Sequence, residues 1–276
     1  MTDAAYSPAH PRRHASWLSA EPRLAATGIV LALSLAATLP ALMLDTRLFQ
    51  GENVWIKPVK FQVALAVYLF TLTFFARFLP EGMTARRTYR AFSWLVVFAI
   101  VAEMVWIGGA AMLQTASHFN TSSPLMEALY GLMGVFAVTL TAMSLVYAIA
   151  IWRNPASGLA PATRLSIALG LGLTFVLTVI AAGTLSMQGG HFIGTPQTGA
   201  ALPLMGWSGE VGDLRVAHFF ATHALHFLPL AGLAATWALP QRAALRATWA
   251  ASLAFTAFVA FTYAQALMGL PLIPLG

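Results

Sequence analysis

Seven long apolar stretches, separated by short polar segments, run through the chain from residue 24 to residue 268. Each is about 20 residues or longer, the length that a helix needs to cross the hydrocarbon core of a bilayer. Because the bilayer interior offers no water to the backbone, such segments must be helical. We therefore predict an all-α fold, a polytopic membrane helix bundle. Its seven transmembrane helices are expected at residues 24–44, 55–77, 92–113, 125–152, 165–187, 216–237 and 248–268.

The polar segments suggest a simple domain organisation. Residues 1–22 are predicted to be a flexible cytoplasmic tail, and residues 23–276 a single seven-helix transmembrane domain. The longest connection, 188–215, contains seven of the 21 glycines together with Trp207. Loops of this length usually have a function of their own. We expect this one to fold back over the bundle as a periplasmic lid, with a loose surface loop as the alternative.

The basic residues alternate between the two sides of the predicted membrane. Eleven fall on one side and four on the other. The four are Arg47, Lys57, Lys60 and Arg215. The positive-inside rule places the N-terminus in the cytoplasm and the C-terminus outside. Five tryptophans fall at the predicted cytoplasmic interface, as an aromatic belt would.

The composition excludes several classes of protein. Hydrophobic residues make up 59% of the chain and charged residues 9%, so the lipid bilayer is the expected partner. The net charge of +6 does not indicate a nucleic-acid partner, because topology alone explains the distribution of basic residues. Without cysteine, disulfides, thiolate metal sites and iron–sulfur clusters are excluded.

Polar residues gather in the outer half of the sixth stretch, whereas the cytoplasmic half of the bundle is predicted to be almost purely apolar. Arg215, His218, Thr222 and His226 are spaced by three or four residues, which places them on one helical face, with His223 close by. At 1.5 Å per residue, His226 lies about 16 Å below Arg215, near the middle of the membrane. Histidines at this depth are candidates for a functional site.

A buried carboxylate accompanies these histidines. Glu103 lies near mid-membrane in the third stretch, at a depth similar to that of His223 and His226, which we expect to be its partners. His118 and His191 could join from the outer loops. Imidazoles and a carboxylate suit a transition metal or a haem. The alternative is that the imidazoles only form hydrogen bonds between helices.

Three cations stand where a helix N-terminus disfavours them. Lys57 and Lys60 begin the second stretch and Arg215 begins the sixth, so each needs a carboxylate or a bound anion. An outer network of ion pairs and an anion site are both possible. The candidate carboxylates are Asp45, Glu52, Glu127, Glu210 and Asp213. For Glu127 a role in the first turn of its own helix is sufficient.

These residues leave three classes of function open. The first is a metal- or haem-binding protein, whether or not it is an enzyme. The second is a transporter or channel with an outward-facing vestibule for an anionic or polar solute. The third is a membrane scaffold or assembly subunit. Retinal is disfavoured, because the only two lysines are at the mouth of the second stretch.

Three segments carry a resemblance to a family. Residues 54–61 (VWIKPVKF), 117–124 (SHFNTSSP) and 206–219, with Gly206-Trp207-Ser208 and GDLRVAHF, are similar to those of an uncharacterised family of bacterial seven-helix integral membrane proteins. The resemblance spans the second to the sixth stretch and implies a multi-pass protein of the bacterial inner membrane, without indicating an activity. It also implies that the position of His226 is often glutamine, which favours His118, His218 and His223 as ligands.

Overall fold

The structure is a computed structural model, and it describes residues 16–275. Most of the tail predicted at 1–22, with Arg12 and Arg13, lies outside the described residues. The part of that segment that is described is ordered. Residues Trp17–Ala20 form the short 3-10 helix η1, and Glu21, which follows it, is completely buried.

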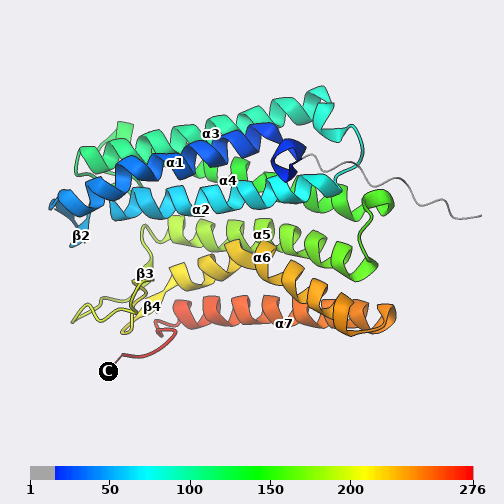
Figure 1. Ribbon diagram of the computed structural model, residues 1–276. Helices are drawn as coiled ribbons and strands as arrows, with labels where there is room; N and C mark the ends of the chain where they lie inside the picture. The colour runs from blue at the N-terminus through cyan, green and yellow to red at the C-terminus, as the bar shows by residue number, and fades with distance from the viewer. Residues whose placement is uncertain (1–15, 276) are drawn as a thin grey trace, which may run out of the picture.

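Seven helices long and apolar enough to cross a membrane confirm the predicted all-α bundle (Figure 1). They are α1 (Pro22–Leu44), α2 (Ile56–Phe75), α3 (Arg87–Met112), α4 (Pro124–Trp152), α5 (Pro161–Met187), α6 (Leu214–Ala238) and α7 (Gln241–Leu267). Each predicted stretch overlaps one of them. The other short helices are η2 (Ala76–Phe78), η3 (Met83–Ala85) and η4 (Pro155–Ser157).

The strands are short and all lie at one end of the bundle. Strand β1 (Leu48–Phe49) pairs antiparallel with β2 (Glu52–Asn53) between α1 and α2. Strand β3 (Phe192–Ile193) pairs antiparallel with β4 (Gly212–Asp213), so the two ends of the long loop before α6 are joined. This loop is therefore anchored at its base.

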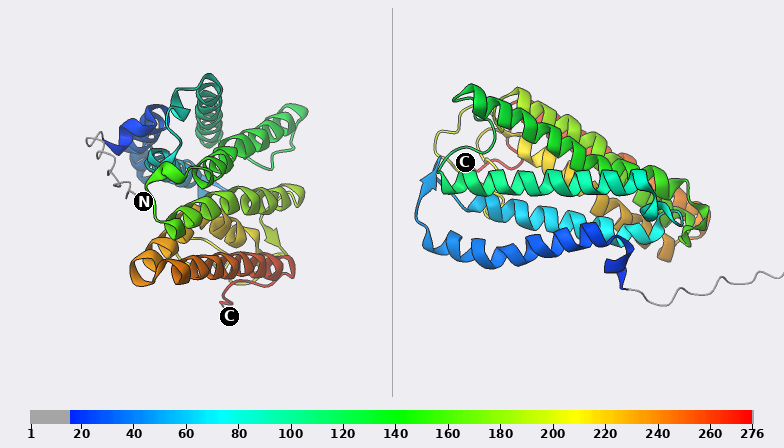
Figure 2. Two further views of the ribbon diagram at one scale, coloured as in Figure 1. Left: turned by 90° about the vertical axis from the view of Figure 1, so that its right-hand side faces the viewer. Right: turned by 90° about the horizontal axis from the view of Figure 1, so that it is seen from above.

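The helices form two groups that meet along α4 and α5. Helices α1, α2, α3 and α4 pack in sequence order, and α5, α6 and α7 pack against one another (Figures 1 and 2). Helices α5 and α6 approach closely because Gly170 faces the backbone of Ala224 and Gly232 faces Ser166. At the same crossing, the hydroxyl of Thr174 accepts a hydrogen bond from the backbone N–H of Leu225 at 2.8 Å.

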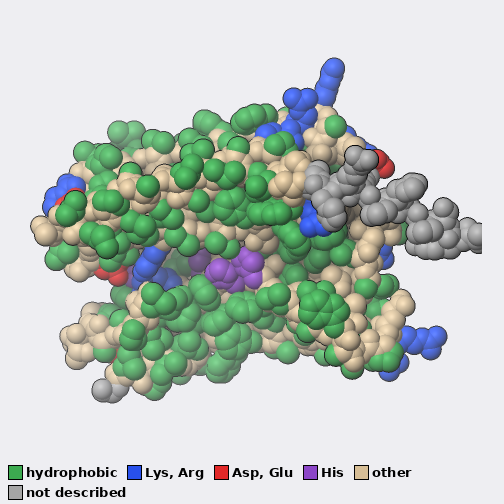
Figure 3. All heavy atoms as spheres, viewed as in Figure 1, with side chains coloured by type: hydrophobic (Ala, Val, Ile, Leu, Met, Phe, Trp, Pro, Cys, Tyr) green, Lys and Arg blue, Asp and Glu red, His purple; other side chains and the backbone are tan. Residues whose placement is uncertain are grey.

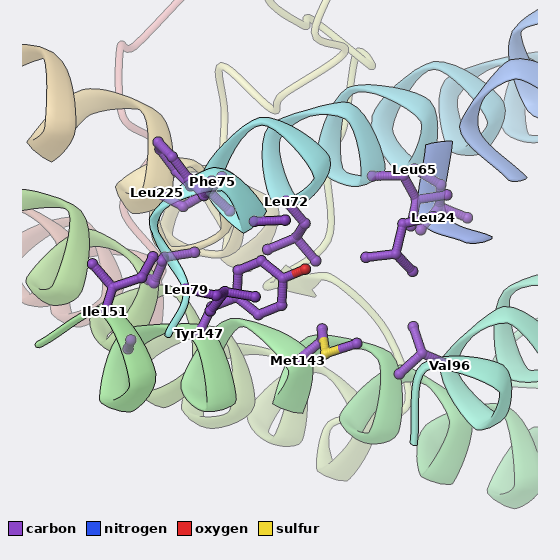
Figure 4. Close-up of a cluster of buried hydrophobic side chains, with 14 of the residues drawn as sticks. Leu24, Leu65, Leu72, Phe75, Leu79, Val96, Met143, Tyr147, Ile151 and Leu225 are labelled. Atoms are coloured by element: carbon purple, nitrogen blue, oxygen red, sulfur yellow. The ribbon is translucent and has the colours of Figure 1, made fainter. Parts of the chain in front are cut away.

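The buried core lies between α2, α3 and α4. Leu72, Val96, Met143 and Tyr147 are among its completely buried members, and Leu225 joins them from α6 (Figure 4). The outer surface of the bundle is also apolar, with many exposed leucines, valines and phenylalanines (Figure 3). An apolar core inside an apolar surface is the expected pattern for a bundle surrounded by lipid.

The two ends of the bundle differ in charge. We name the arginine end after the arginines of the connections α2–α3, α4–α5 and α6–α7, and the lysine end after Lys57 and Lys60. The arginine end carries Arg77, Arg86, Arg87, Arg90, Arg153, Arg164, Arg242 and Arg246. Exposed Trp94, Trp152, Trp237 and Trp249 lie near this end, where an aromatic belt belongs.

Candidate functional site

The centre of the site is a lysine in the first turn of α2. Helix α2 begins at Ile56, and Pro58 is tolerated there because a first-turn N–H has no partner within the helix. The ammonium nitrogen Nζ of Lys57 lies 3.1 Å from Nδ1 of His118, its only hydrogen-bond partner among residues 16–275. A lysine ammonium can only donate, so Nδ1 accepts, and the neutral ring carries its proton on Nε2.

His118 reaches this position because the α3–α4 loop folds back against the bundle. The indole Nε1 of Trp106, six residues before the end of α3 at Met112, donates to the backbone carbonyl of Ser117 at 2.8 Å. Asn120 donates to the carbonyl of Ala116 at 3.1 Å, and both Ser117 and Asn120 are buried. The loop thus places the imidazole of His118 inside the bundle, beside side chains of α3.

Glu103 lies on the other side of the His118 ring. Its carboxylate is 2% exposed, and Oε2 lies 3.9 Å from Nε2 of His118, too far for a hydrogen bond. Neither carboxylate oxygen has a hydrogen-bond partner among the described residues. The expectation that His223 and His226 would pair with Glu103 is wrong. That expectation rested on the similar depth of Glu103 and the two histidines in the membrane, but α3 turns the Glu103 side chain toward His118 and Lys57.

The ring of His118 stays neutral between the two charged groups. Burial, and after it the positive charge of Lys57, lowers the pKa of His118 to about 3. A neutral imidazole therefore separates the ammonium of Lys57 from the carboxylate of Glu103. The aromatic rings of Phe61 and Tyr130 lie 5.8 Å and 6.2 Å from the His118 ring, measured between centroids, and enclose it.

The histidines of α6 form a separate group. Nδ1 of His223 lies 3.0 Å from Nδ1 of His226, and Nε2 of His226 lies 3.0 Å from the hydroxyl of Thr71 on α2. The stripe predicted for α6 therefore faces α2 at His226. Closer to the lysine end, Nδ1 of His218 is buried and has no hydrogen-bond partner among the described residues.

Arg215 is held by a carboxylate, as the ion-pair alternative predicts. Its guanidinium pairs with Asp213 at 2.6 Å and donates to the carbonyl of Gly206, also at 2.6 Å. Asp213 is 1% exposed and also accepts from the backbone N–H groups of Ser208 and Arg215 at 3.0 Å. This pair therefore closes the base of the long loop.

His191, directly before β3, belongs to the same loop base, because its carbonyl accepts from the backbone N–H of Leu214 at 2.9 Å. Its pKa is lowered, chiefly by burial and then by Arg215, while Asp213 and Glu52 oppose this change and Lys57 adds to it. The long loop lies near the beginning of α2, because its residues 202, 204 and 206 line one cleft together with Glu52 and residues 56, 59 and 60. His191 itself forms no hydrogen bond with Glu103.

The long loop itself has an ordered structure at the lysine end of the bundle. Trp207 is 8% exposed and packs against Phe219, with ring centroids 5.4 Å apart. The backbone N–H groups of Thr198 and Gln197, the hydroxyl of Thr198 and the backbone N–H of Ala200 donate to the carboxylate of Glu210, and these bonds lower its pKa to about 2. A cleft of about 360 Å³ remains between the loop and α2, and Lys60 is exposed in it. Its lining residues are Leu42, Glu52, Ile56, Val59, Lys60, Leu202, Leu204 and Gly206.

The geometry does not assemble the predicted ligands into one metal site. No group of three or more His, Cys, Asp or Glu side chains within residues 16–275 is placed to hold an ion. The six candidates are instead divided into the His118–Glu103 pair, the His223–His226 pair, His218 and His191. Glu127 lies in the first turn of α4, after the cap formed by Ser123, where its charge suits the helix end.

A second polar cluster was missed at the arginine end. Glu21 is 0% exposed and accepts two hydrogen bonds from Arg23, at 2.6 Å and 2.8 Å, and one from Ser93 at 3.2 Å. Beside it, the hydroxyls of Tyr89 and Tyr147 lie 2.8 Å apart. The expectation of an almost purely apolar cytoplasmic half is therefore wrong. The sequence feature that indicates this cluster is Glu21 itself, a carboxylate directly before the Pro22 that begins α1.

Comparisons with protein-family models, with curated proteins and with solved structures gave no match. The chain is a multi-pass membrane protein by its seven helices, and its site is interpreted from its own geometry.

Proposed function

We propose that this membrane protein binds a small anion at Lys57 and carries it across the bilayer. The observation that supports this most strongly is the partner of Lys57. Its ammonium has three donors, and the hydrogen-bond partner found for it is a neutral imidazole. An anion that reached Lys57 from the cleft between the long loop and α2 would supply the acceptors that the remaining donors lack.

The buried carboxylate gives a reason for coupling this anion to a proton. With Glu103 ionised and Lys57 charged, the empty site carries no net charge. A proton on Glu103 would leave the charge of Lys57 uncompensated, and one bound monovalent anion would restore neutrality. The anion and one proton would then move together, so the occupied and empty sites would have the same net charge. The carboxylate oxygens of Glu103 receive no hydrogen bond from the described residues, which suits a group that accepts a proton.

The opposite end of the bundle supports an outward-facing state. There, Glu21, Arg23 and Ser93 tie α1 to α3, and the Tyr89–Tyr147 pair ties α3 to α4. A transporter that is open at the lysine end needs such a closure at its other end. Movement of a solute would require this cluster to open.

The proposed orientation follows the positive-inside rule. The arginine end would face the cytoplasm of a bacterial cell, and the long loop would face the periplasm. Reporter fusions should show residues 82 and 158 as cytoplasmic and residue 198 as periplasmic. The opposite labelling of any of these positions would contradict this orientation.

The anion is tested by titration and by flux. Phosphate, sulfate, acetate and succinate are each titrated into the purified protein in uncharged nanodiscs, and uptake of each is measured in proteoliposomes. We expect saturable binding of at least one, weakened by about tenfold to a hundredfold in Lys57→Met, as expected for a hydrogen bond to a charged group. Arg246→Met at the arginine end is the control and should bind normally. Equal binding by Lys57→Met and the unaltered protein would refute the proposal, as would the absence of binding by all four anions.

One observation favours the metal hypothesis as a second candidate. The two Nδ1 atoms of His223 and His226 are 3.0 Å apart, near the separation of about 3.3 Å expected for two ligands of one tetrahedral zinc ion. The ion would take its further ligands from elsewhere. Metal analysis of the gently purified protein should then find one ion per chain, lost in the His223→Ala, His226→Ala double variant. A metal-free protein that takes up no added zinc would exclude this candidate.

A further inference from the structure

A second cleft, between α2 and α6, opens toward the side of the bundle (Figure 3). Figure 3 looks across the helix axes, from within the plane of the membrane, and shows histidine side chains at the surface between the two helix groups. His223 and His226 are both partly exposed, and Thr71 faces them from α2. At 1.5 Å per residue, His223 lies about 14 Å from the start of α6, well inside a hydrocarbon core of about 30 Å. A ligand at this opening would therefore arrive from the lipid phase.

A chain of hydrogen bonds ends at this opening. The hydroxyl of Thr71 donates to the carbonyl of Val67 at 2.8 Å, so Nε2–H of His226 donates to Thr71, and Nδ1–H of His223 donates to Nδ1 of His226. Nε2 of His223 is then a free acceptor, with no hydrogen-bond partner among the described residues. If Thr71 instead donates to His226, every bond reverses and the same Nε2 becomes a donor.

The surroundings of His223 are aromatic and apolar. The ring of Phe219 lies 4.3 Å from the His223 ring between centroids, and that of Phe227 lies at 6.5 Å. On the α2 side, Val63 and Val67 are 45% and 44% exposed. The cleft therefore offers a flat ring surface and an aliphatic wall beside one hydrogen-bonding nitrogen that can change its role.

We propose that this cleft binds a lipid-soluble molecule with a planar, hydrogen-bonding head group, of the quinone class. While Thr71 donates to Val67, a hydroxyl group of the ligand would donate to Nε2 of His223. After the chain reverses, Nε2–H of His223 would donate to a carbonyl oxygen of the ligand. The head group would lie against Phe219, and the apolar tail would lie along Val63 and Val67 toward the bilayer. This site uses none of the residues of the anion site, so the two proposals succeed or fail independently.

The test uses the whole chain in nanodiscs of phosphatidylcholine that contain no quinone, titrated with decylubiquinone. Binding is measured by equilibrium dialysis and by quenching of tryptophan fluorescence, because Trp207 lies beside Phe219. We expect saturable binding that weakens about tenfold in His223→Ala. Thr71→Val keeps the shape of the side chain but removes the reversible end of the chain, and should weaken binding several-fold.

A matched control is available on α4. The hydroxyl of Thr139 donates to the carbonyl of Val135 at 2.8 Å, as that of Thr71 does to the carbonyl of Val67. Unlike Thr71, Thr139 forms no hydrogen bond with a histidine among the described residues. Thr139→Val should bind decylubiquinone like the unaltered protein. Non-saturable partitioning alone, or equal affinity in His223→Ala, would overturn the proposal. A dimer in solution would also overturn it, if the Val67→Trp substitution dissociated that dimer and decylubiquinone did not. A second copy of the chain would then occupy the cleft.

Discussion

The polar clusters at the two ends of the bundle contain similar groups in opposite states. At the arginine end, the buried carboxylate of Glu21 accepts hydrogen bonds from Arg23 and Ser93. At the lysine end, the equally buried carboxylate of Glu103 accepts none among the described residues, and Lys57 faces a neutral ring. An unsatisfied buried polar group costs about 1–3 kcal/mol, more if charged. The satisfied cluster therefore suits a structural fastening, and the unsatisfied one suits a site completed by a ligand or a proton.

Replacement of Glu21 by Gln should give the largest effect. It removes the charge that compensates Arg23, and breaking a buried pair from one side costs about 3 kcal/mol or more. The free energy of unfolding, measured by denaturant titration in detergent micelles, should fall by about this amount. A loss below about 1 kcal/mol would show that the cluster at the arginine end does not fasten the helices.

The pH dependence of the free energy of unfolding should show that His118 is buried in its neutral form. Because its pKa in the folded protein is lowered to about 3, the folded state binds fewer protons than the unfolded state once the pH falls below the ordinary value near 6.5. Its contribution to stability is therefore complete above that value and is lost as the pH falls toward 3. Between about pH 7 and about pH 5, the unaltered protein should lose about 2 kcal/mol more than His118→Gln. Parallel curves for the two proteins would contradict the buried, neutral ring.

Replacement of Glu103 by Gln should give the smallest effect. It removes a buried carboxylate that receives no hydrogen bond, which is favourable, but it leaves the charge of Lys57 uncompensated across the His118 ring, which is unfavourable. Because these two effects oppose each other, the free energy of unfolding should change by less than about 1 kcal/mol. The same denaturant titration measures it, with Glu21→Gln as the contrasting variant. If Glu103→Gln destabilised the protein as much as Glu21→Gln, the difference between the two ends would disappear.

The helices could be predicted from the sequence because hydrophobic length alone determines them. Helical spacing predicts which α6 residues share a face, but it does not predict that this face meets α2 at His226. The partner of Glu103 could not be predicted in this way. Depth in the membrane gives one coordinate, whereas the direction of a side chain around α3 depends on how α3 packs.

Two other features depend on contacts that no local pattern encodes. The α3–α4 loop folds inward because Trp106 binds the carbonyl of Ser117, and a single indole in an apolar stretch does not indicate this. Glu21 reads as part of a polar tail, since its burial under α3 depends on Ser93, 72 residues away. Both polar clusters are thus assembled by tertiary contacts.

The acylation of Lys57 tests the central claim most directly, because Lys57 and Lys60 are the only lysines in the chain. An amine-reactive ester is applied to the protein in nanodiscs, with and without saturating phosphate, sulfate, acetate or succinate, and modification at each lysine is quantified by mass spectrometry. We expect at least one anion to slow the acylation of Lys57 several-fold, with a smaller effect on the exposed Lys60. If Lys57 were modified at the same rate with and without every anion, the claim that its free donors form an anion site would be contradicted.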